Sequence, residues 1–380
     1  MKFSKIVILL SLFIVTPELT VANSPHDLVE NTFFKDSLIQ NTEIDVRTSY
    51  GFYAHHHFEM SSYSAHFPTF ELSLQKQTYG KSSWQSYFNY PTIGVTALYS
   101  GLGNIDIIGK AYAIYPFINF PFNKSKTNTF GLRFGVGLGY ITEKFDLTSK
   151  YHNISIGSNF NAAINIALEY KHYLSNRFKF SVFAGLTHFS NGCSNYPNSG
   201  INIINAGAGL TYLLTDPHSY IPKSEDNDNY LKTIDCEYYI GISAGIKRIE
   251  YNQKENIGVY HIDFYIMDRI SNLSKIGLGF DLVYDATDNI SIIDDYGYKR
   301  FTFIEMLKPG ISLAYELMMG DASFLFNFGY HPYGLDMSFG RWYQKIAMKV
   351  DLGNYIYGKI TLNTHFGVAD FIGFGIGVRL

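Results

Sequence analysis

The stretch FGLRFGVGLGY, residues 130–140, alternates large apolar residues with glycine or arginine. Successive side chains of a β-strand point to opposite faces, so this segment would have one apolar face and one face of small or charged residues. Transmembrane β-barrels show this pattern, with the apolar face toward lipid and the other toward the lumen. We therefore predict a membrane-spanning strand here.

The composition fits an exported membrane barrel. The chain has 31 tyrosines, 31 phenylalanines and 33 glycines, and its charged fraction is 17%, below the roughly 25% of soluble domains. Residues 1–22 read as a secretory signal peptide, with Lys2 and Lys5 ahead of an apolar core. After this segment, no apolar run approaches the roughly 20 residues that a membrane helix needs. The net charge of −3 gives no reason to expect a nucleic-acid partner.

Alternation recurs before residue 216 in eight segments, which we predict to be strands: 43–58, 64–79, 89–101, 107–120, 129–146, 161–174, 178–191 and 201–214. Eight is the smallest common number of strands in an outer-membrane barrel. The polar stretch 215–235 then reads as a linker or a long loop. The expected order is a signal peptide at 1–22, a barrel at 43–214, this linker, and a second unit at 236–380.

The second half resembles the first in its order of strands. Segments 179–189 and 357–366 both end in Thr-His-Phe, and each precedes a glycine-rich final strand. With about eight strands expected after residue 235, we predict two related eight-stranded barrels in tandem; one merged barrel of about 14–16 strands is the alternative. The second copy has Gly367 two positions after His365, where the first has a serine. We read His365 as a structural residue that points into the barrel unless a bulge intervenes.

The first copy places His188 and Ser190 two positions apart near the end of the seventh predicted strand. The two side chains share a face, and that face is the apolar one. Histidine is the usual base for activating serine at neutral pH. Asn202 would return beside His188 if the connection is a hairpin, where it could orient the imidazole. Asn191 and Gly192 begin a turn-rich segment whose backbone amides could form an oxyanion hole.

The run HFSNG at 188–192, followed by PNSGIN at 197–202, resembles the signature of PagL-type lipid A 3-O-deacylases, which are eight-stranded outer-membrane barrels. That signature is His-x-Ser-Asn near the end of the seventh strand and Asn-x-Gly shortly afterwards. The resemblance extends over roughly 43–214. It implies a bacterial outer-membrane location and the hydrolysis of an ester-linked acyl chain.

The same resemblance implies roles for individual residues. His188 would be the general base, Ser190 the nucleophile, and the amides of Asn191 and Gly192 the oxyanion donors. The chain departs from the family at Asn202, because well-understood members carry an acidic residue there. An amide stabilises an imidazolium less than a carboxylate does.

Two other carboxylates, Glu71 and Glu169, are alternative third members of the site. Glu169 falls on the lumen side by alternation, where charged residues are expected in any barrel.

The predicted function is an outer-membrane esterase acting on lipid A or a related bilayer lipid. The acyl chain of an embedded substrate could lie along Leu186 and Ala184 while its ester reaches His188 and Ser190. The alternative is a non-catalytic barrel, either a narrow pore or a structural protein, with an inherited inactive motif. No cofactor is expected, and the sequence does not predict the oligomeric state.

Two further features suggest no additional site. Of the three histidines at 55–57, only the first and third could share a strand face, and Glu59 is the one carboxylate that stands out nearby. This ligand set is incomplete, so we expect no metal site there. Cys193 and Cys236 could pair in an exported protein, but the low cysteine count makes a disulfide the less favoured reading.

Overall fold

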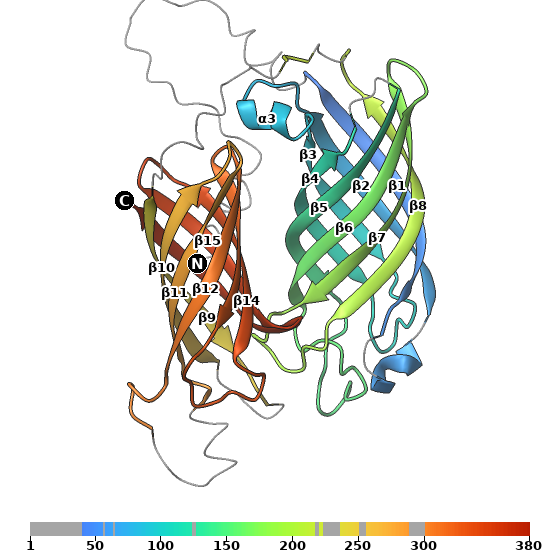
Figure 1. Cartoon of the computed structure of the whole chain (residues 1–380). Coiled ribbons are helices and arrows are strands. Elements are labelled where there is room, and N and C mark those ends of the chain that lie inside the picture. The colour runs from blue at the N-terminus through green and yellow to red at the C-terminus, as the bar shows by residue number, and fades with distance from the viewer. Residues whose placement is uncertain are drawn as a thin grey trace, which may run out of the picture. The chain divides into compact units, whose positions relative to one another are not determined.

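The computed structural model describes residues 40–55, 58–63, 65–123, 127–216, 220–222, 236–250, 256–288 and 301–380. The described strands form two closed antiparallel barrels of eight strands each (Figure 1). The prediction of two eight-stranded units is confirmed, and the merged barrel is wrong. The predicted signal peptide at 1–22 and most of the predicted linker at 215–235 lie outside the described residues.

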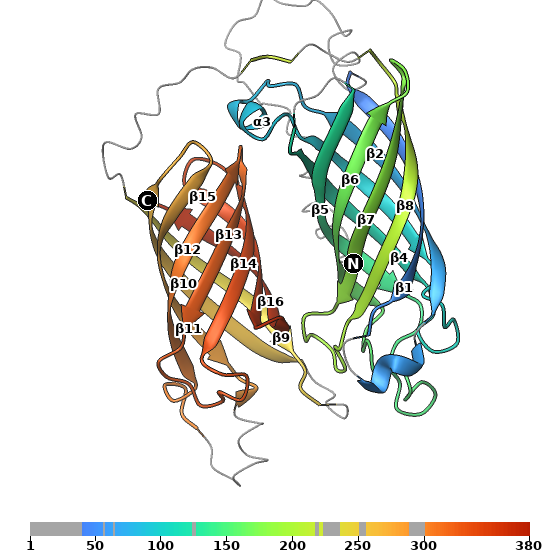
Figure 2. The same ribbon diagram turned by 45° about the vertical axis from the view of Figure 1, so that its right-hand side comes forward.

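The first barrel runs in chain order through β1 Thr42–Tyr53, β2 His66–Gln77, β3 Thr92–Ser100, β4 Ala111–Pro121, β5 Asn128–Ile141, β6 Phe160–Tyr173, β7 Phe178–Ser190 and β8 Ile201–Leu213. Each strand pairs with its neighbours in sequence, and β1 pairs with β8 to close the sheet. Strands β6, β7 and β8 lie side by side in both views (Figures 1 and 2).

Two strands of this barrel end five residues earlier than predicted. The first stops at Tyr53 rather than at residue 58, and a short 3-10 helix, η1 (Phe58–Tyr63), follows it. The fifth stops at Ile141 rather than at residue 146. Asp146 instead forms a local turn, because its carboxylate accepts the backbone N–H of Thr148 at 3.0 Å. A short helix, α3 (Ser83–Tyr87), also lies between β2 and β3, where no helix was predicted.

The second barrel comprises β9 Glu237–Lys247, β10 Ile257–Arg269, β11 Ser274–Asp285, β12 Leu307–Met319, β13 Ala322–Tyr330, β14 Trp342–Asp351, β15 Ile356–His365 and β16 Val368–Arg379. Here β16 pairs with β9 to close the sheet. Among the described residues, no helix is long and apolar enough to cross a membrane.

The alternation in β5 has a packing reason. Phe130, Leu138 and Tyr140 are exposed on the outer face, whereas Arg133 is fully buried in the lumen. A Cβ added to Gly139 would lie 2.5 Å from the Phe189 ring, so glycine makes room for a large lumen side chain. The small residues of this strand therefore accommodate bulky neighbours that fill the lumen.

Buried charges occupy the lumen of the first barrel. Arg47 pairs with Asp45 at 2.5 Å and also with Glu169, and Lys179 pairs with Glu43 at 2.5 Å. All five side chains are nearly inaccessible to solvent. An eight-stranded barrel is just wide enough for side chains to fill it, and these residues do so.

The two ends of the first barrel differ in their connections. Those beyond the end of β7 are long: 54–65, 101–110, 142–159 and 191–200. At the other end, 122–127 and 174–177 are short, and 78–91 carries α3. The segment with the predicted catalytic motif therefore lies at the end with the long connections.

Candidate active site

The alternation of β7 puts His188 and Ser190 on the outer-face side of the strand, where Ser190, the last residue of β7, is 9% exposed. The alternate residues Lys179, Ser181 and Thr187 are buried toward the lumen. Val182 and Leu186, which share the parity of His188, are 43% and 37% exposed on the outside. Residues two apart in a strand share a face. His188 and Ser190 therefore come at the end of a row of apolar side chains on the outer face of β7.

Asn202 lies directly opposite His188 in the pairing of β7 with β8. The side-chain oxygen Oδ1 of Asn202 is 2.6 Å from Nδ1 of His188. An amide oxygen only accepts hydrogen bonds, so Nδ1 must carry the proton. In the neutral imidazole this leaves the lone pair on Nε2, which is the atom that can take a proton from a serine.

Gly200 closes the other side of the imidazole. Its φ of +81° is in the left-handed region, and a Cβ built there would be 2.8 Å from Cε1 of His188. Its N–H donates to the carbonyl of Ser155 at 2.9 Å, and its carbonyl accepts from the hydroxyl of Tyr53 at 3.3 Å. The imidazole is thus held between Asn202 and a glycine whose backbone is itself anchored.

Tyr53 and Ser155 were not identified from the sequence. Their side-chain oxygens are 3.1 Å apart, and they come from the end of β1 and from the connection between β5 and β6. No local motif marks either residue. Only the closure of the barrel, which pairs β1 with β8, brings Tyr53 to Gly200.

The connection after Ser190 is held by its own side chains. The N–H of Asn191 donates to Oδ1 of Asn198 at 2.8 Å, and the carbonyl of Asn191 accepts from the N–H of Ser194 at 3.2 Å. Gly192 has a φ of +58°, a conformation that favours glycine. The Asn191 amide must therefore leave Asn198 before it can bind an oxyanion, which is a condition that the sequence did not reveal.

The two alternative carboxylates do not reach His188. Glu169 points into the lumen, where it bonds to Arg47 and Asn119. Glu71 also faces the lumen, with Oε2 at 3.9 Å from Arg133. Both lie on the opposite face of the sheet from His188, so the idea that either one orients the imidazole is wrong.

Leu186 and Ala184, the predicted substrate contacts, continue the outer face below His188. Register pairing sets Leu186 opposite Ile204, and Ala184 opposite Ala206. Leu186 and Ile204 are both exposed. Together these four outward-facing side chains form an apolar strip that continues from His188 along β7 and β8.

The second copy of the motif has a different environment. Nδ1 of His365 donates to the carbonyl of Trp342 at 2.9 Å, and Gly367 stands where a serine would be needed. The pairing of β15 with β16 shifts register between Asn363 and Thr364, which leaves Asp370 as an extra residue. A bulge therefore does intervene beside this histidine.

The remaining predictions concern metals and cysteines. Two of the histidines at 55–57, His56 and His57, lie outside the described residues. Within the described ranges, no group of three His, Cys, Asp or Glu side chains is placed to hold a metal ion. Cys193 and Cys236 are both free thiols.

Solved structures similar to this chain are outer-membrane barrels. The outer membrane enzyme PagL is 21% identical, with 43% of this chain and 97% of that chain covered and a TM-score of 0.32. Neisserial surface protein A (NspA) is 12% identical, with 46% and 97% covered and a TM-score of 0.30. A triple mutant of the Rh. blastica porin is 9% identical, with 89% and 100% covered and a TM-score of 0.18.

Sequence families account for both halves of the chain. Residues 68–211 match the family described as lipid A 3-O-deacylase (PagL), and residues 236–380 match the acyloxyacyl hydrolase C-terminal domain. No curated protein sequence matches the chain. On these two family matches, the chain belongs to the lipid A 3-O-deacylase family and is a protein of the bacterial outer membrane.

Proposed function

We propose that the first barrel is a serine esterase that removes an ester-linked acyl chain from lipid A or a closely related bilayer lipid. The observation that carries this proposal is the 2.6 Å contact between His188 Nδ1 and Asn202 Oδ1. It orients a neutral base on the outer face of β7, two residues before Ser190. The family match at 68–211 supports the same chemistry.

The reaction begins when the Ser190 hydroxyl attacks the ester carbonyl and Nε2 of His188 takes its proton. The oxyanion of the tetrahedral intermediate is stabilised by backbone amides at the start of the connection, of which Gly192 is one candidate and Asn191 another after it leaves Asn198. Collapse of the intermediate gives an acyl-enzyme and releases the alcohol, which takes the proton from His188. Water then hydrolyses the acyl-enzyme with His188 again as base.

The position of the motif suits a substrate in the external leaflet. Outer-membrane barrels have short periplasmic turns and longer extracellular loops. Ser190 ends β7 at the side with the long connections, so its hydroxyl would lie near the extracellular boundary of the membrane. Lipid A occupies that leaflet, and its acyl chains would extend from there along β7 toward the membrane centre.

The outer face of β7 and β8 provides the contact for such a chain. Moving inward from His188, the rows are Leu186 with Ile204 and Ala184 with Ala206. A chain lying in this strip stays in an apolar environment while its ester is at the boundary. The strip therefore gives Leu186 and Ala184 a role in aligning the ester.

The alternative function is a non-catalytic barrel, and Asn202 in place of an acidic residue is the observation that favours it. The pore version of this alternative has less support, because buried ion pairs occupy the lumen of the first barrel.

Mass spectrometry of lipid A separates these functions. Cells expressing the wild-type chain should contain lipid A lacking one ester-linked acyl chain. Cells expressing Ser190→Ala should contain the unmodified lipid at equal protein level. Ser338→Ala, an exposed serine of the second barrel, is the control and should behave as wild type. Identical spectra for the wild type and Ser190→Ala would rule out the esterase for lipid A.

A further inference from the structure

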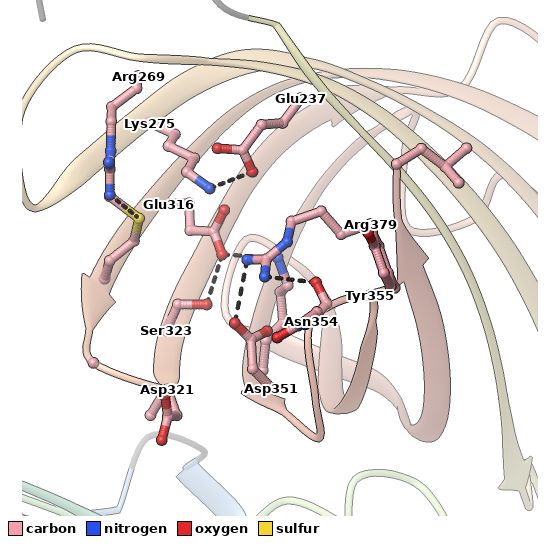
Figure 3. A pocket seen from close by; sticks show the side chains of 15 residues that line it. Glu237, Arg269, Lys275, Glu316, Asp321, Ser323, Asp351, Asn354, Tyr355 and Arg379 are labelled. Carbon is pink, nitrogen blue, oxygen red and sulfur yellow. Dashed lines mark hydrogen bonds and ion pairs between the residues drawn. The ribbon is translucent and has the colours of Figure 1, made fainter.

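The second barrel contains a polar cavity of about 440 Å³ that has no part in the proposed esterase (Figure 3). It lies at the end of the barrel where the connections are short turns: 270–273, 320–321 and 352–355. The connection 286–306 at the opposite end is far longer. Since short turns of outer-membrane barrels face the periplasm, the cavity opens on the periplasmic side.

Six of the eight charged side chains around the cavity form three ion pairs, and the other two, Arg269 and Asp321, carry opposite charges. Lys349 lies 2.7 Å from Glu316, and Arg379 lies 3.2 Å from Asp351. A third pair, Lys275 with Glu237, has a separation of 2.7 Å. A ligand with a full charge would have to compete with these partners, so the chemistry favours a neutral ligand with many hydrogen-bonding groups.

One acceptor in the cavity wall lacks a donor. Glu316 is only 3% exposed, and its Oε1 accepts from Lys349 at 2.7 Å and from the hydroxyl of Ser323 at 2.6 Å. Its other oxygen, Oε2, has no hydrogen-bond partner within the described part of the chain. A buried carboxylate oxygen without a donor is unfavourable. A ligand hydroxyl or amide N–H would satisfy it.

The rim of the cavity adds an aromatic surface. Tyr355 is 68% exposed at the turn between β14 and β15. Arg379 holds this turn, because it donates to the carbonyl of Asn354 at 2.9 Å as well as pairing with Asp351 (Figure 3). An aromatic ring on an anchored turn, beside planar polar side chains, can stack on the C–H face of a sugar while the sugar hydroxyls bond to those side chains.

We propose that this cavity binds a neutral carbohydrate of one or two sugar rings from the periplasmic side. Its volume is within the roughly 300–1,000 Å³ of small-molecule sites. Glu316 accepts from a sugar hydroxyl or N-acetyl amide, Tyr355 stacks on the ring, and the paired charges around the wall supply further donors and acceptors. The site would give the second barrel a binding role that does not depend on Ser190.

The test uses the full chain in detergent and saturation-transfer NMR with four sugars at millimolar concentration. These are glucose, maltose, N-acetylglucosamine and its β-1,4-linked disaccharide, and inorganic phosphate is the charged competitor. Saturation of ring protons in at least one sugar, unaffected by phosphate, is expected. N-acetylglucosamine and its disaccharide represent cell-wall glycan, whereas glucose and maltose represent unmodified glycans. Which of the two pairs binds therefore identifies the class of glycan that the cavity accepts.

Variants localise the binding. Tyr355→Ala should weaken it at least tenfold, whereas Leu352→Ala, an exposed residue of the same turn that does not line the cavity, should leave it unchanged. Glu316→Gln should also weaken it at least tenfold in protein that retains folded migration on unheated gels. The proposal is overturned if no sugar receives saturation, if phosphate displaces the sugar, or if Tyr355→Ala binds as well as Leu352→Ala.

Discussion

The Cα of Gly200 lies against the imidazole of His188, so closely that a Cβ at this position would be 2.8 Å from Cε1 and 3.6 Å from Nε2. Atoms at the shorter distance overlap. The residue also has a φ of +81°, which glycine adopts at little cost. Gly200 therefore limits where the imidazole of His188 can lie, while Asn202 sets how the ring is turned.

Gly200→Ala should reduce kcat/KM for lipid A by about 100-fold, since an added methyl group would displace the imidazole and small misplacements of catalytic groups have effects of this size. Gly367→Ala is the matched control. Gly367 has a similar φ of +89°, but nothing lies within 4 Å of its added Cβ, so it should lose no activity. Deacylation assays in micelles give both values. Equal activity in the two variants would show that the imidazole tolerates the methyl group.

Asn202→Asp should raise kcat/KM by tenfold or more, because a carboxylate would stabilise the imidazolium that forms when His188 takes the Ser190 proton. Asn202→Leu should lower it instead, since nothing would then hold the proton on Nδ1. Both variants keep the pairing of β7 with β8, so their thermal stabilities should be close. If Asn202→Asp is no faster than the wild type, the amide is not what limits the rate.

Ala184→Phe should lower kcat/KM for lipid A by about tenfold and shift the preference toward shorter acyl chains. The reason is that a phenyl ring would occupy the apolar strip between Leu186 and Val182. Ala97→Phe is the control, as Ala97 is exposed on β3, which is four strands from β7. The readout is activity against lipid A species that differ in acyl length. An equal effect of the two substitutions would show that the strip does not contact the chain.

Strand number and facing were predictable from the sequence because lipid and lumen impose a strict period of two. The run at 130–140 shows this directly, since its glycines and Arg133 face the lumen and its aromatic residues face out. Strand ends were less predictable. The fifth strand stops at Ile141, and Asp146, within the range predicted for it, accepts local hydrogen bonds in a turn, which a pattern based on hydrophobicity alone does not register.

The contact of His188 with Asn202 follows from hairpin geometry, so parity and spacing sufficed to anticipate it. The anchoring of Gly200 by Tyr53 and Ser155 did not follow, because 147 residues separate Tyr53 from Gly200. Their meeting depends on which strands close the barrel. The hydrogen bond from the Asn191 amide to Asn198 was also hidden, since it depends on the conformation of a loop with several glycine and asparagine residues.

Arg47→Met should lower the free energy of unfolding of the first barrel by about 3 kcal/mol, because it leaves Asp45 and Glu169 buried without their main partner. Arg177→Met removes an ion pair of 3.2 Å with Asp216 in which both side chains are exposed, together with hydrogen bonds to the carbonyls of Leu213 and Leu214. It should change the free energy of unfolding by only about 1 kcal/mol. Guanidinium titration in lipid vesicles measures the free energy of unfolding of both variants. Unfolding is monitored by the fluorescence of Trp84 in a Trp342→Phe background. Trp84 then reports on the first barrel alone, since it lies in α3 between β2 and β3. A loss as small for Arg47→Met as for Arg177→Met would mean that water or rearranged lysines satisfy the lumen carboxylates, and that the buried pairs do not hold this barrel together.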